Sequence, residues 1–273
     1  FAMECYEAGI LTKEDTDGIE LVWGSADAML AMIHKIAKRE GIGNLLADGV
    51  KKAAEKLGRG SEKFALHVKG QELPMHEPRG KVGLALAYAV SPTGADHMEA
   101  PHDPAFEGLG VMDNGLSEAG LIEPVDRMDF GGKKVWAFFY AQAVWSLYNS
   151  VGMCDFVGIP IGTLKLKELQ NFINGATGWD MSLWELMKVG ERANTMSRMF
   201  NVREGFTVAD DMLPERLYEP LRKGKLEGVS LDKGEFMKAL TTYFRMAGWD
   251  ENGVPTEAKL AELDLVGVGM ELA

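Results

Sequence analysis

The stretch N-S-V-G-M-C-D-F-V-G, residues 149–158, contains Cys154, one of only two cysteines in the chain. A free cysteine is most often a small buried residue, but this one follows a glycine turn that comes directly after a strongly apolar run. Backbone N–H groups in such a turn can face a ligand. A cubane iron–sulfur cluster needs four thiolates, and this chain offers at most Cys5 and Cys154. If Cys154 binds a cluster, its other ligands lie elsewhere; a structural thiol is the alternative.

An earlier stretch, D-T-D-G-I-E at residues 15–20, has the same form as residues 149–154. Each places a short polar side chain three residues before a glycine, so that the side chain and the turn amides can converge on one polar group. Two ordinary turns would show the same pattern. The candidate cofactor-binding positions in these two segments are Asp15, Gly18, Glu20, Asn149, Gly152, Met153 and Cys154.

One of the five histidines, His97, follows S-P-T-G-A-D at the start of a long irregular region. Its neighbours Asp96 and Glu99 are carboxylates, and a loop histidine beside carboxylates can act as a general acid or base near neutral pH. A surface histidine is the alternative. The other histidines lack the i, i+4 partner of a zinc-binding helix: His34, His67, His76 and His102.

Two acidic residues near the start of the chain, Glu4 and Glu7, are candidates for metal binding. On a helix their spacing places both carboxylates on one face, where they could ligate a divalent ion. A solvated pair of acidic side chains is the more common outcome of this spacing.

The composition limits the kind of protein that these residues serve. The 273 residues are 46% hydrophobic, enough for a sizeable core, and 41 acidic against 29 basic side chains give a formal net charge of -12. This charge repels phosphate backbones and anionic membranes, so we expect neither as a partner. No apolar stretch reaches the roughly 20 residues that span a bilayer. Two distant cysteines favour a reducing compartment, the cytoplasm.

The elements that position these residues are predicted to be mainly helical, with a few short strands. Apolar spacing and capping signals predict helices up to Gly9, over 26–40, 44–57, 82–90, 130–148 and 166–173, from a capping box at 182–185 to about 203, around 236–244, and over T-E-A-K-L-A-E-L near the end. Strands are expected at 19–23 and 64–68, and a long loop region with short helical turns at 95–129.

Four further motifs accompany the two paired segments in a fixed order. They are E-P-R-G at 77–80, S-P-T-G-A-D-H at 91–97, N-V-R-E-G-F at 201–206 and L-P-E-R-L at 213–217. With this ordered set, the chain resembles the aldehyde:ferredoxin oxidoreductase family of tungstopterin enzymes. The resemblance implies a mainly α fold with two helical subdomains, 1–90 and 91–273, that correspond to domains 2 and 3 of that family.

Members of that family bind tungsten, or occasionally molybdenum, between two pyranopterins, beside one 4Fe-4S cluster. They oxidise aldehydes to carboxylic acids and pass the electrons through the cluster to ferredoxin. The family's N-terminal β domain, with its C-x-x-C-x-x-x-C segment, is missing from this sequence, which begins without Met and is expected to be a fragment. We therefore expect the isolated chain to bind neither tungstopterin nor cluster and to be inactive.

The resemblance also implies roles for the residues in the two paired segments. Cys154 corresponds to the fourth, remote cluster ligand, and the segments 15–20 and 149–154 correspond to the two pterin-binding motifs. The family usually has aspartate where this chain has Asn149. Asparagine keeps an acceptor oxygen but loses the charge that would hold a pterin amine.

Outside those segments, His97 corresponds to a histidine of the tungsten pocket and would supply proton transfer. Glu4 or Glu7 corresponds to a glutamate that binds iron at a homodimer interface in some members, with His67 as the nearest accompanying histidine.

Two other functions are compatible with the same motifs. An aromatic acyl-CoA reductase active-site subunit would share the pterin motifs and enclose a larger pocket. A non-catalytic helical interaction module would keep the fold without the cofactor. A polar cleft around Asp15, His97 and Cys154 would argue against the module, whereas apolar side chains filling it would favour it.

Overall fold

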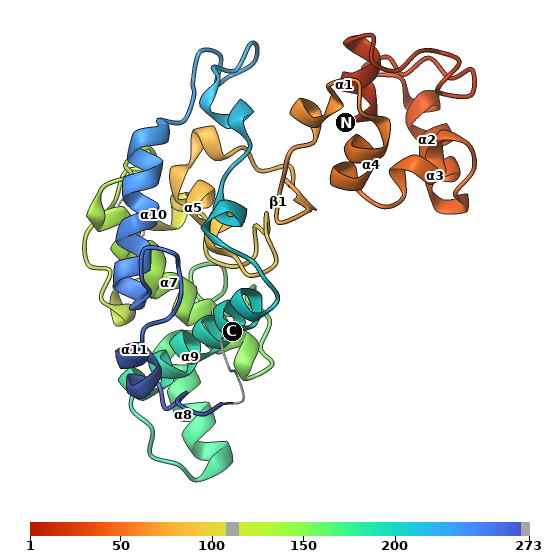
Figure 1. Ribbon diagram of the computed structural model, residues 1–273. Helices are drawn as coiled ribbons and strands as arrows, with labels where there is room; N and C mark the ends of the chain where they lie inside the picture. The colour runs from red at the N-terminus through yellow and green to blue at the C-terminus, as the bar shows by residue number, and fades with distance from the viewer. Residues whose placement is uncertain (108–114, 269–273) are drawn as a thin grey trace.

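The computed structural model describes residues 1–107 and 115–268. Over these residues the chain is mainly helical with one two-stranded sheet, which confirms the predicted fold class. Figure 1 shows helices α1 to α4 in a small lobe and the later helices in a larger lobe, with the sheet between them. Within the described ranges, no helix is both long enough and apolar enough to cross a membrane.

The elements follow one another along the chain with short connections. The small lobe contains α1 (Ala2–Glu7), α2 (Ala26–Lys38), α3 (Ile42–Leu46), α4 (Val50–Leu57) and the 3-10 helix η1 (Ser61–Phe64). The antiparallel strands are β1 (His67–Val68) and β2 (Gln71–Glu72). The larger lobe contains α5 (Val82–Val90), α7 (Gly132–Ser150), α8 (Leu166–Thr177), α9 (Leu183–Arg203), α10 (Lys233–Ala247) and α11 (Glu257–Glu262). Its 3-10 helices are η2 (Pro78–Gly80), η3 (Asp103–Phe106), η4 (Leu116–Ala119), η5 (Val208–Asp211) and η6 (Glu215–Tyr218).

Three predictions for the first 70 residues are wrong in whole or in part. The single helix expected over 44–57 is two helices, because Gly49 between them has a φ of +88°, outside the helical range. The strand expected over 19–23 does not form: residues 19–22 are irregular, and the Val22 amide donates to the Glu20 carbonyl (3.0 Å). The strand expected over 64–68 is reduced to β1, because η1 occupies the residues before it.

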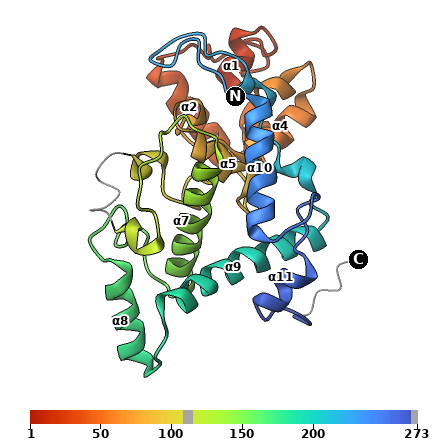
Figure 2. The same cartoon turned by 90° about the vertical axis from the view of Figure 1, so that its left-hand side faces the viewer.

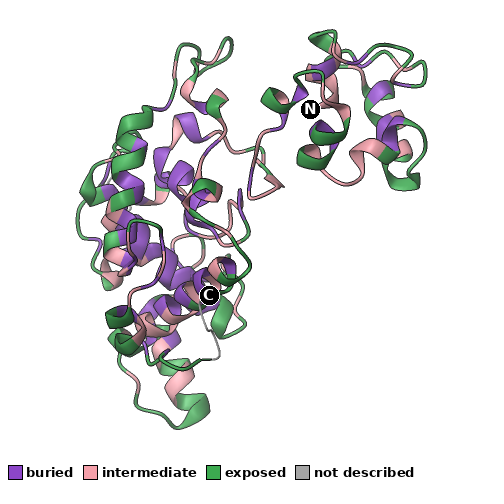
Figure 3. Cartoon of the chain, viewed as in Figure 1, coloured by how far each residue is buried: buried purple, intermediate pink, exposed green. Residues whose placement is uncertain are grey.

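Helix α7 forms the centre of the larger lobe and is buried over most of its length (Figure 3). Figure 2 shows α10 running alongside it and α9 crossing both. Helix α9 approaches α7 closely at Gly190, where an added Cβ atom would lie 1.9 Å from the carbonyl oxygen of Ala143. On the α10 side, the Tyr243 hydroxyl donates to the Gln142 Oε1 atom (2.6 Å) inside the core. These contacts hold the middle of α7 against α9 and α10.

A buried carboxylate ties the irregular region after residue 95 to two helices. Asp103 accepts hydrogen bonds from the amides of Gly83 (2.9 Å) and Leu84 (3.1 Å), so it caps the first turn of α5 from outside that helix. It also pairs with Lys134 of α7, and both side chains are almost wholly buried. The polypeptide between Ser91 and Asp103 is therefore fixed by charge and hydrogen bonds rather than by a sheet.

The two lobes are joined by an ion pair as well as by the chain. Glu4 of α1 accepts two hydrogen bonds from the guanidinium of Arg216 in η6 (2.8 and 2.9 Å), which itself lies over the ring of Phe64 (5.5 Å). The predicted division into subdomains after residue 90 stays a prediction. Helix α5, immediately before that boundary, packs against α7 and α10.

Candidate functional site

The turn that follows α7 presents Cys154 to solvent. Gly152 has a φ of +72°, and its amide donates to the carbonyl of Asn149 (3.1 Å), while the Met153 amide donates to the carbonyl of Tyr148 (2.9 Å). An added Cβ at Gly152 would meet no atom within 4 Å, so the turn faces open space. Cys154 and Asn149 are both exposed. The turn thus offers a thiol that a ligand can reach, which a structural core cysteine would not.

The residue after this cysteine, Asp155, carries a partly buried carboxyl group. The Oδ1 atom of Asp155 is shielded from solvent and has no hydrogen-bond partner among the described residues. Burial, with a smaller contribution from the Asp96 carboxylate, raises the pKa of Asp155 to about 6. Burial, together with the charges of Asp96 and Asp155, raises the pKa of Glu99 to about 7. Because these carboxyl groups act on one another, the loop that carries His97 must lie close to the Cys154 turn.

His97 is one of three histidines whose rings lie together. Its ring stacks on that of His76, with ring centroids 4.7 Å apart and an interplanar angle of 27°. The ring of His102 lies 4.6 Å from that of His76 and 5.9 Å from that of His97. The three residues come from two separate irregular segments, 74–81 and 95–103, which α5 and Asp103 hold side by side.

One lysine, Lys81, lies within hydrogen-bond distance of two of these rings. Its Nζ atom is 3.1 Å from Nδ1 of His76 and 2.9 Å from Nδ1 of His102. Burial, with the charge of Lys81, lowers the pKa of His76, and burial also lowers that of His102 against the opposing hydrogen bond to the His97 carbonyl. Burial likewise lowers the pKa of Lys81 itself. Neutral imidazole rings are therefore favoured at His76 and His102.

The first of the paired segments, residues 15–20, lies in the small lobe. Its glycine, Gly18, has a φ of +83° as the turn requires. The Asp15 carboxylate accepts from the Thr12 amide (2.9 Å) and pairs with Arg59 (3.1 Å), and Glu20 pairs with Lys13 (2.8 Å). Among the described residues, no hydrogen bond or ion pair joins this segment to the Cys154 turn. Convergence of the two segments on one cofactor stays a prediction.

Glu4 and Glu7 have separate protein partners. The Glu4 carboxylate is paired with Arg216, whose hydrogen bonds lower its pKa, and Glu7 accepts from the Trp23 indole N–H (3.1 Å). Nowhere in ranges 1–107 and 115–268 do three or more His, Cys, Asp or Glu side chains form a group that could hold a metal ion. A metal ion at Glu4 would have to displace Arg216, so metal binding by this pair stays a prediction.

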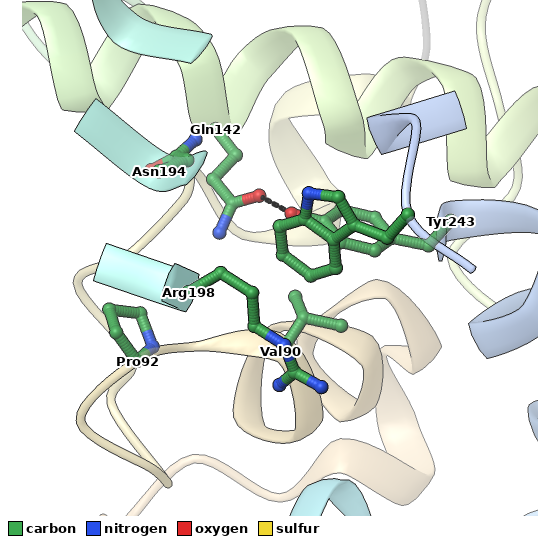
Figure 4. Close-up of a pocket in the computed structure, with 7 residues that line it drawn as sticks. Val90, Pro92, Gln142, Asn194, Arg198 and Tyr243 are labelled. Atoms are coloured by element: carbon green, nitrogen blue, oxygen red, sulfur yellow. Dashed lines mark hydrogen bonds between the residues drawn. The ribbon is translucent and has the colours of Figure 1, made fainter. Parts of the chain in front are cut away.

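A small pocket lies behind the loop that leads to His97 (Figure 4). It has room for about one water molecule, too little for a substrate. Arg198 lines it, held between an ion pair to the fully buried Asp211 (2.8 Å) and the ring of Trp249 (5.1 Å). Asn201, one helical turn further along α9, donates to the carbonyl of Pro92 (2.8 Å). The residues around this pocket hold the loop in place and do not form a binding site.

Sequence reasoning missed three members of the histidine and lysine cluster. The sequence assigns no role to His76 or His102, because neither has the i, i+4 partner of a zinc-binding helix, and none to Lys81. The sequence does contain one signal: both histidines are flanked by nearby prolines, which exclude helix and place the rings in irregular segments. Their proximity depends on tertiary contacts that no local pattern shows.

The comparison with known proteins gives the class of this fold. A family profile described as "Aldehyde ferredoxin oxidoreductase, domains 2 & 3" matches residues 1–265. The chain therefore belongs to the aldehyde ferredoxin oxidoreductase family, as the ordered motifs predict.

Individual relatives are consistent with this membership. The chain is 34% identical over 269 residues to a tungsten-containing aldehyde ferredoxin oxidoreductase of Pyrococcus abyssi, and the match covers 97% of this chain but 41% of the relative. It is 32% identical over 278 residues to an aliphatic sulfonate oxidoreductase, WOR-like subunit, of Pyrococcus furiosus, covering 97% of this chain and 39% of the relative. The chain thus spans about two fifths of the length of these relatives.

A solved structure shares the fold. The active site complex BamBC of benzoyl coenzyme A reductase, in complex with 1,5-dienoyl-CoA, superposes with a TM-score of 0.72 at 23% identity. The alignment covers 98% of this chain and 43% of that one. At this identity the likeness concerns the fold alone.

The residues of the turn after α7 fit one part of a tungstopterin and cluster site. An exposed thiol, an open glycine turn and a buried carboxyl oxygen without a hydrogen-bond partner occur within four consecutive residues, Gly152 to Asp155. One thiolate is a quarter of the ligand set of a cubane, and the only other cysteine, Cys5, is fully buried. The chain therefore has one exposed thiol that could serve as a ligand of such a cluster.

Proposed function

We propose that this chain forms part of the cofactor site of a tungsten-dependent oxidoreductase. The proposed reaction is the oxidation of an aldehyde to a carboxylic acid, with the electrons passed through a 4Fe-4S cluster to ferredoxin. Family membership over residues 1–265 supports the reaction class. The observation that supports a site in this chain is the exposed Cys154 thiol next to the unpaired, buried Asp155 carboxyl oxygen.

In this proposal each part of the site has its own task. Cys154 supplies one thiolate to the cluster. The turns at Gly18 and Gly152 would present the side chains of Asp15, Glu20 and Asn149 to the pterins, and Met153 packs behind the second turn. The bound metal supplies the two-electron chemistry.

The loop beside the turn would manage protons. His97 would exchange a proton with the substrate oxygen. Glu99, whose pKa is raised to about 7 by burial and by neighbouring carboxylates, can hold or release a proton close to neutral pH. The buried helices α5 and α7 keep this loop in place and limit the access of water from the core side.

The experiment uses the whole protein that carries this chain, purified without oxygen. Tungsten, molybdenum and iron are measured per protein, and turnover is measured with aldehydes of increasing size and ferredoxin as acceptor. We expect Cys154→Ser to lose cluster iron, while Cys5→Ala keeps it, because Cys5 lies in the core of the small lobe. We expect His97→Gln to keep both metals and lose most turnover. Full turnover in C154S and H97Q would refute these roles.

The same protein tests the other candidate functions. Turnover of acyl-CoA substrates with none of aldehydes would favour a reductase related to the benzoyl-CoA enzyme that shares this fold. Oxidation of aliphatic sulfonates would favour the activity named for the WOR-like relative. A protein that contains neither tungsten nor iron would favour a non-catalytic module. The partners ferredoxin, the missing pterin-binding domain and a second copy in a homodimer are part of this proposal.

A further inference from the structure

The contacts of Lys81 determine the protonation state of two rings in the histidine cluster. The Nε2 atom of His102 lies 2.8 Å from the backbone carbonyl oxygen of His97. A carbonyl oxygen only accepts hydrogen bonds, so His102 must carry a proton on Nε2. A neutral ring with its proton on Nε2 has a lone pair on Nδ1, and this is the atom that faces the Lys81 ammonium at 2.9 Å.

The same argument applies to His76. Its Nδ1 atom lies 3.1 Å from the Nζ atom of Lys81, and an ammonium group has three donors and no acceptor. Lys81 therefore donates to Nδ1 of His76, whose proton is left on Nε2. A positive charge on either ring would place it next to an ammonium in a partly buried site, which is unfavourable.

We propose that Lys81 is a positioning residue that locks His76 and His102 as neutral rings protonated on Nε2, and through them fixes His97. His102 holds the backbone of His97 by its carbonyl, and His76 supports its ring by stacking at 4.7 Å. The Tyr88 hydroxyl in turn holds the carbonyl of His76 (3.0 Å). The tautomers follow from these contacts alone, whereas the catalytic value of His97 rests on the proposed function.

Burial lowers the pKa of Lys81, and the charges near it act in opposite directions. It precedes the first residue of α5, a position where a positive charge is disfavoured by the helix dipole, and Arg127 adds a like charge. The fully buried Asp103 opposes both effects. The charged and titratable groups that act on the cluster are therefore Lys81, Asp103, Arg127, and the rings of His76, His97 and His102.

Nitrogen NMR of the whole protein, labelled at histidine with nitrogen-15, reads the tautomers directly. In the wild type we expect His76 and His102 each to show a lone pair on Nδ1 and a proton on Nε2, assigned with single His→Gln variants. In Lys81→Met we expect both rings to titrate at higher pH and His76 to lose its single tautomer, while His102 keeps its Nε2 proton through the His97 carbonyl. Lys81→Arg keeps a donor and should preserve the wild-type pattern. Lys13→Met, at an exposed ion pair in the small lobe, is the control.

The outcomes separate this proposal from the proposed function. Protonation on Nδ1 of either ring in the wild type would overturn it, even if K81M failed to fold. An unchanged histidine pattern in a folded K81M would also overturn it. If the protein turns over aldehydes, K81M should move the pH profile of kcat/KM while K81R does not, which a merely structural lysine would not do. If it has no activity, the proposed function fails and the tautomer result still stands.

Discussion

Replacement of Glu99 by glutamine tests whether the loop beside Cys154 holds a neutral carboxyl group. Burial and the Asp96 and Asp155 carboxylates raise the pKa of Glu99 from 4.5 to about 7. A raised pKa means that the folded state binds this proton more tightly than the unfolded state does. The free energy of unfolding therefore falls as the pH rises from 4.5 through about 7, and levels off above that value.

The magnitude follows from the size of the shift. At about 1.36 kcal/mol per pKa unit, a shift from 4.5 to about 7 corresponds to about 3.4 kcal/mol when the group is fully ionised. About 2.5 kcal/mol of this develops between about pH 5 and about pH 8. Glutamine keeps the shape of a protonated carboxyl group and cannot ionise. Between about pH 5 and about pH 8, the free energy of unfolding of E99Q should therefore rise by about 2.5 kcal/mol relative to that of the wild type.

Urea denaturation of the wild type and of E99Q, measured at several pH values, gives this difference. Subtracting the two curves cancels the contribution of every group that the substitution leaves unchanged. Glu251→Gln, in an exposed turn, is the matched control and should run parallel to the wild type. If the E99Q curve is also parallel to that of the wild type, Glu99 ionises in the folded protein as it does in the unfolded chain. The folded state then does not raise the pKa of Glu99, and the reasoning is refuted.

Three further substitutions or modifications test the scaffold and the thiols. Gly190→Ala should destabilise the fold by about 3 kcal/mol in urea denaturation, because the new methyl group meets the backbone of α7. Iodoacetamide should modify Cys154 in the native chain and reach Cys5, which is fully buried with a pKa raised by burial, only after unfolding; mass spectrometry counts the adducts. Asp103→Asn should cost about 3–5 kcal/mol in urea denaturation by leaving the Lys134 ammonium buried without its counter-charge.

Each of these predictions has a control that separates the stated cause from nonspecific destabilisation of the fold. Gly175→Ala, at a helical position of α8 with open space around it, should stabilise by roughly 0.5–1 kcal/mol, so a comparable loss there would contradict the packing argument. Equal rates of alkylation at both cysteines would contradict the exposure of Cys154. The double variant D103N with Lys134→Met should recover part of the loss; a further loss of stability would show that charge is not the cause.

The helical part of the fold could be predicted from the sequence, because its signals are local. The capping box at Ser182 and Glu185 is formed, with the Glu185 amide donating to Ser182 Oγ (3.2 Å), and α9 runs to residue 203 as expected. The apolar run before Cys154 is the buried α7. The strand expected at 19–23 failed for the opposite reason: β-propensity needs a neighbouring strand, and none lies beside it among the described residues.

The candidate site was predictable only in its separate pieces. Cys154 and His97 were identified from turns and neighbours along the chain, and part of the region between them, residues 108–114, lies outside the described residues. The raised pKa values of Glu99 and Asp155 depend on burial and on each other's charge. The cluster around Lys81 depends on two segments that meet in space. Neither property has a signature in local sequence.

Buried charges under the His97 loop explain how an irregular segment can hold a site. Lys69 and Arg198 flank Asp211, and all three side chains are at most 3% exposed, while Lys134 and Asp103 form a second buried pair. Such pairs rarely improve stability over well-packed apolar side chains, because each ion loses its hydration. Buried ion pairs are, however, directional in a way that apolar contacts are not, because each charged group needs its partner at a defined position.

The backbone of residues 91–103 has no sheet to fix it, so directional contacts must do so. The Asn201 amide holds Pro92, Asp103 is held by the start of α5, and Lys81 reaches His102 from that same helix end. We therefore expect substitutions in this buried polar layer to alter the histidine cluster before they unfold the chain. A Lys69→Met variant that changes the nitrogen spectrum of His97 while it is still folded would support this order; an unchanged spectrum in a variant that melts earlier would contradict it.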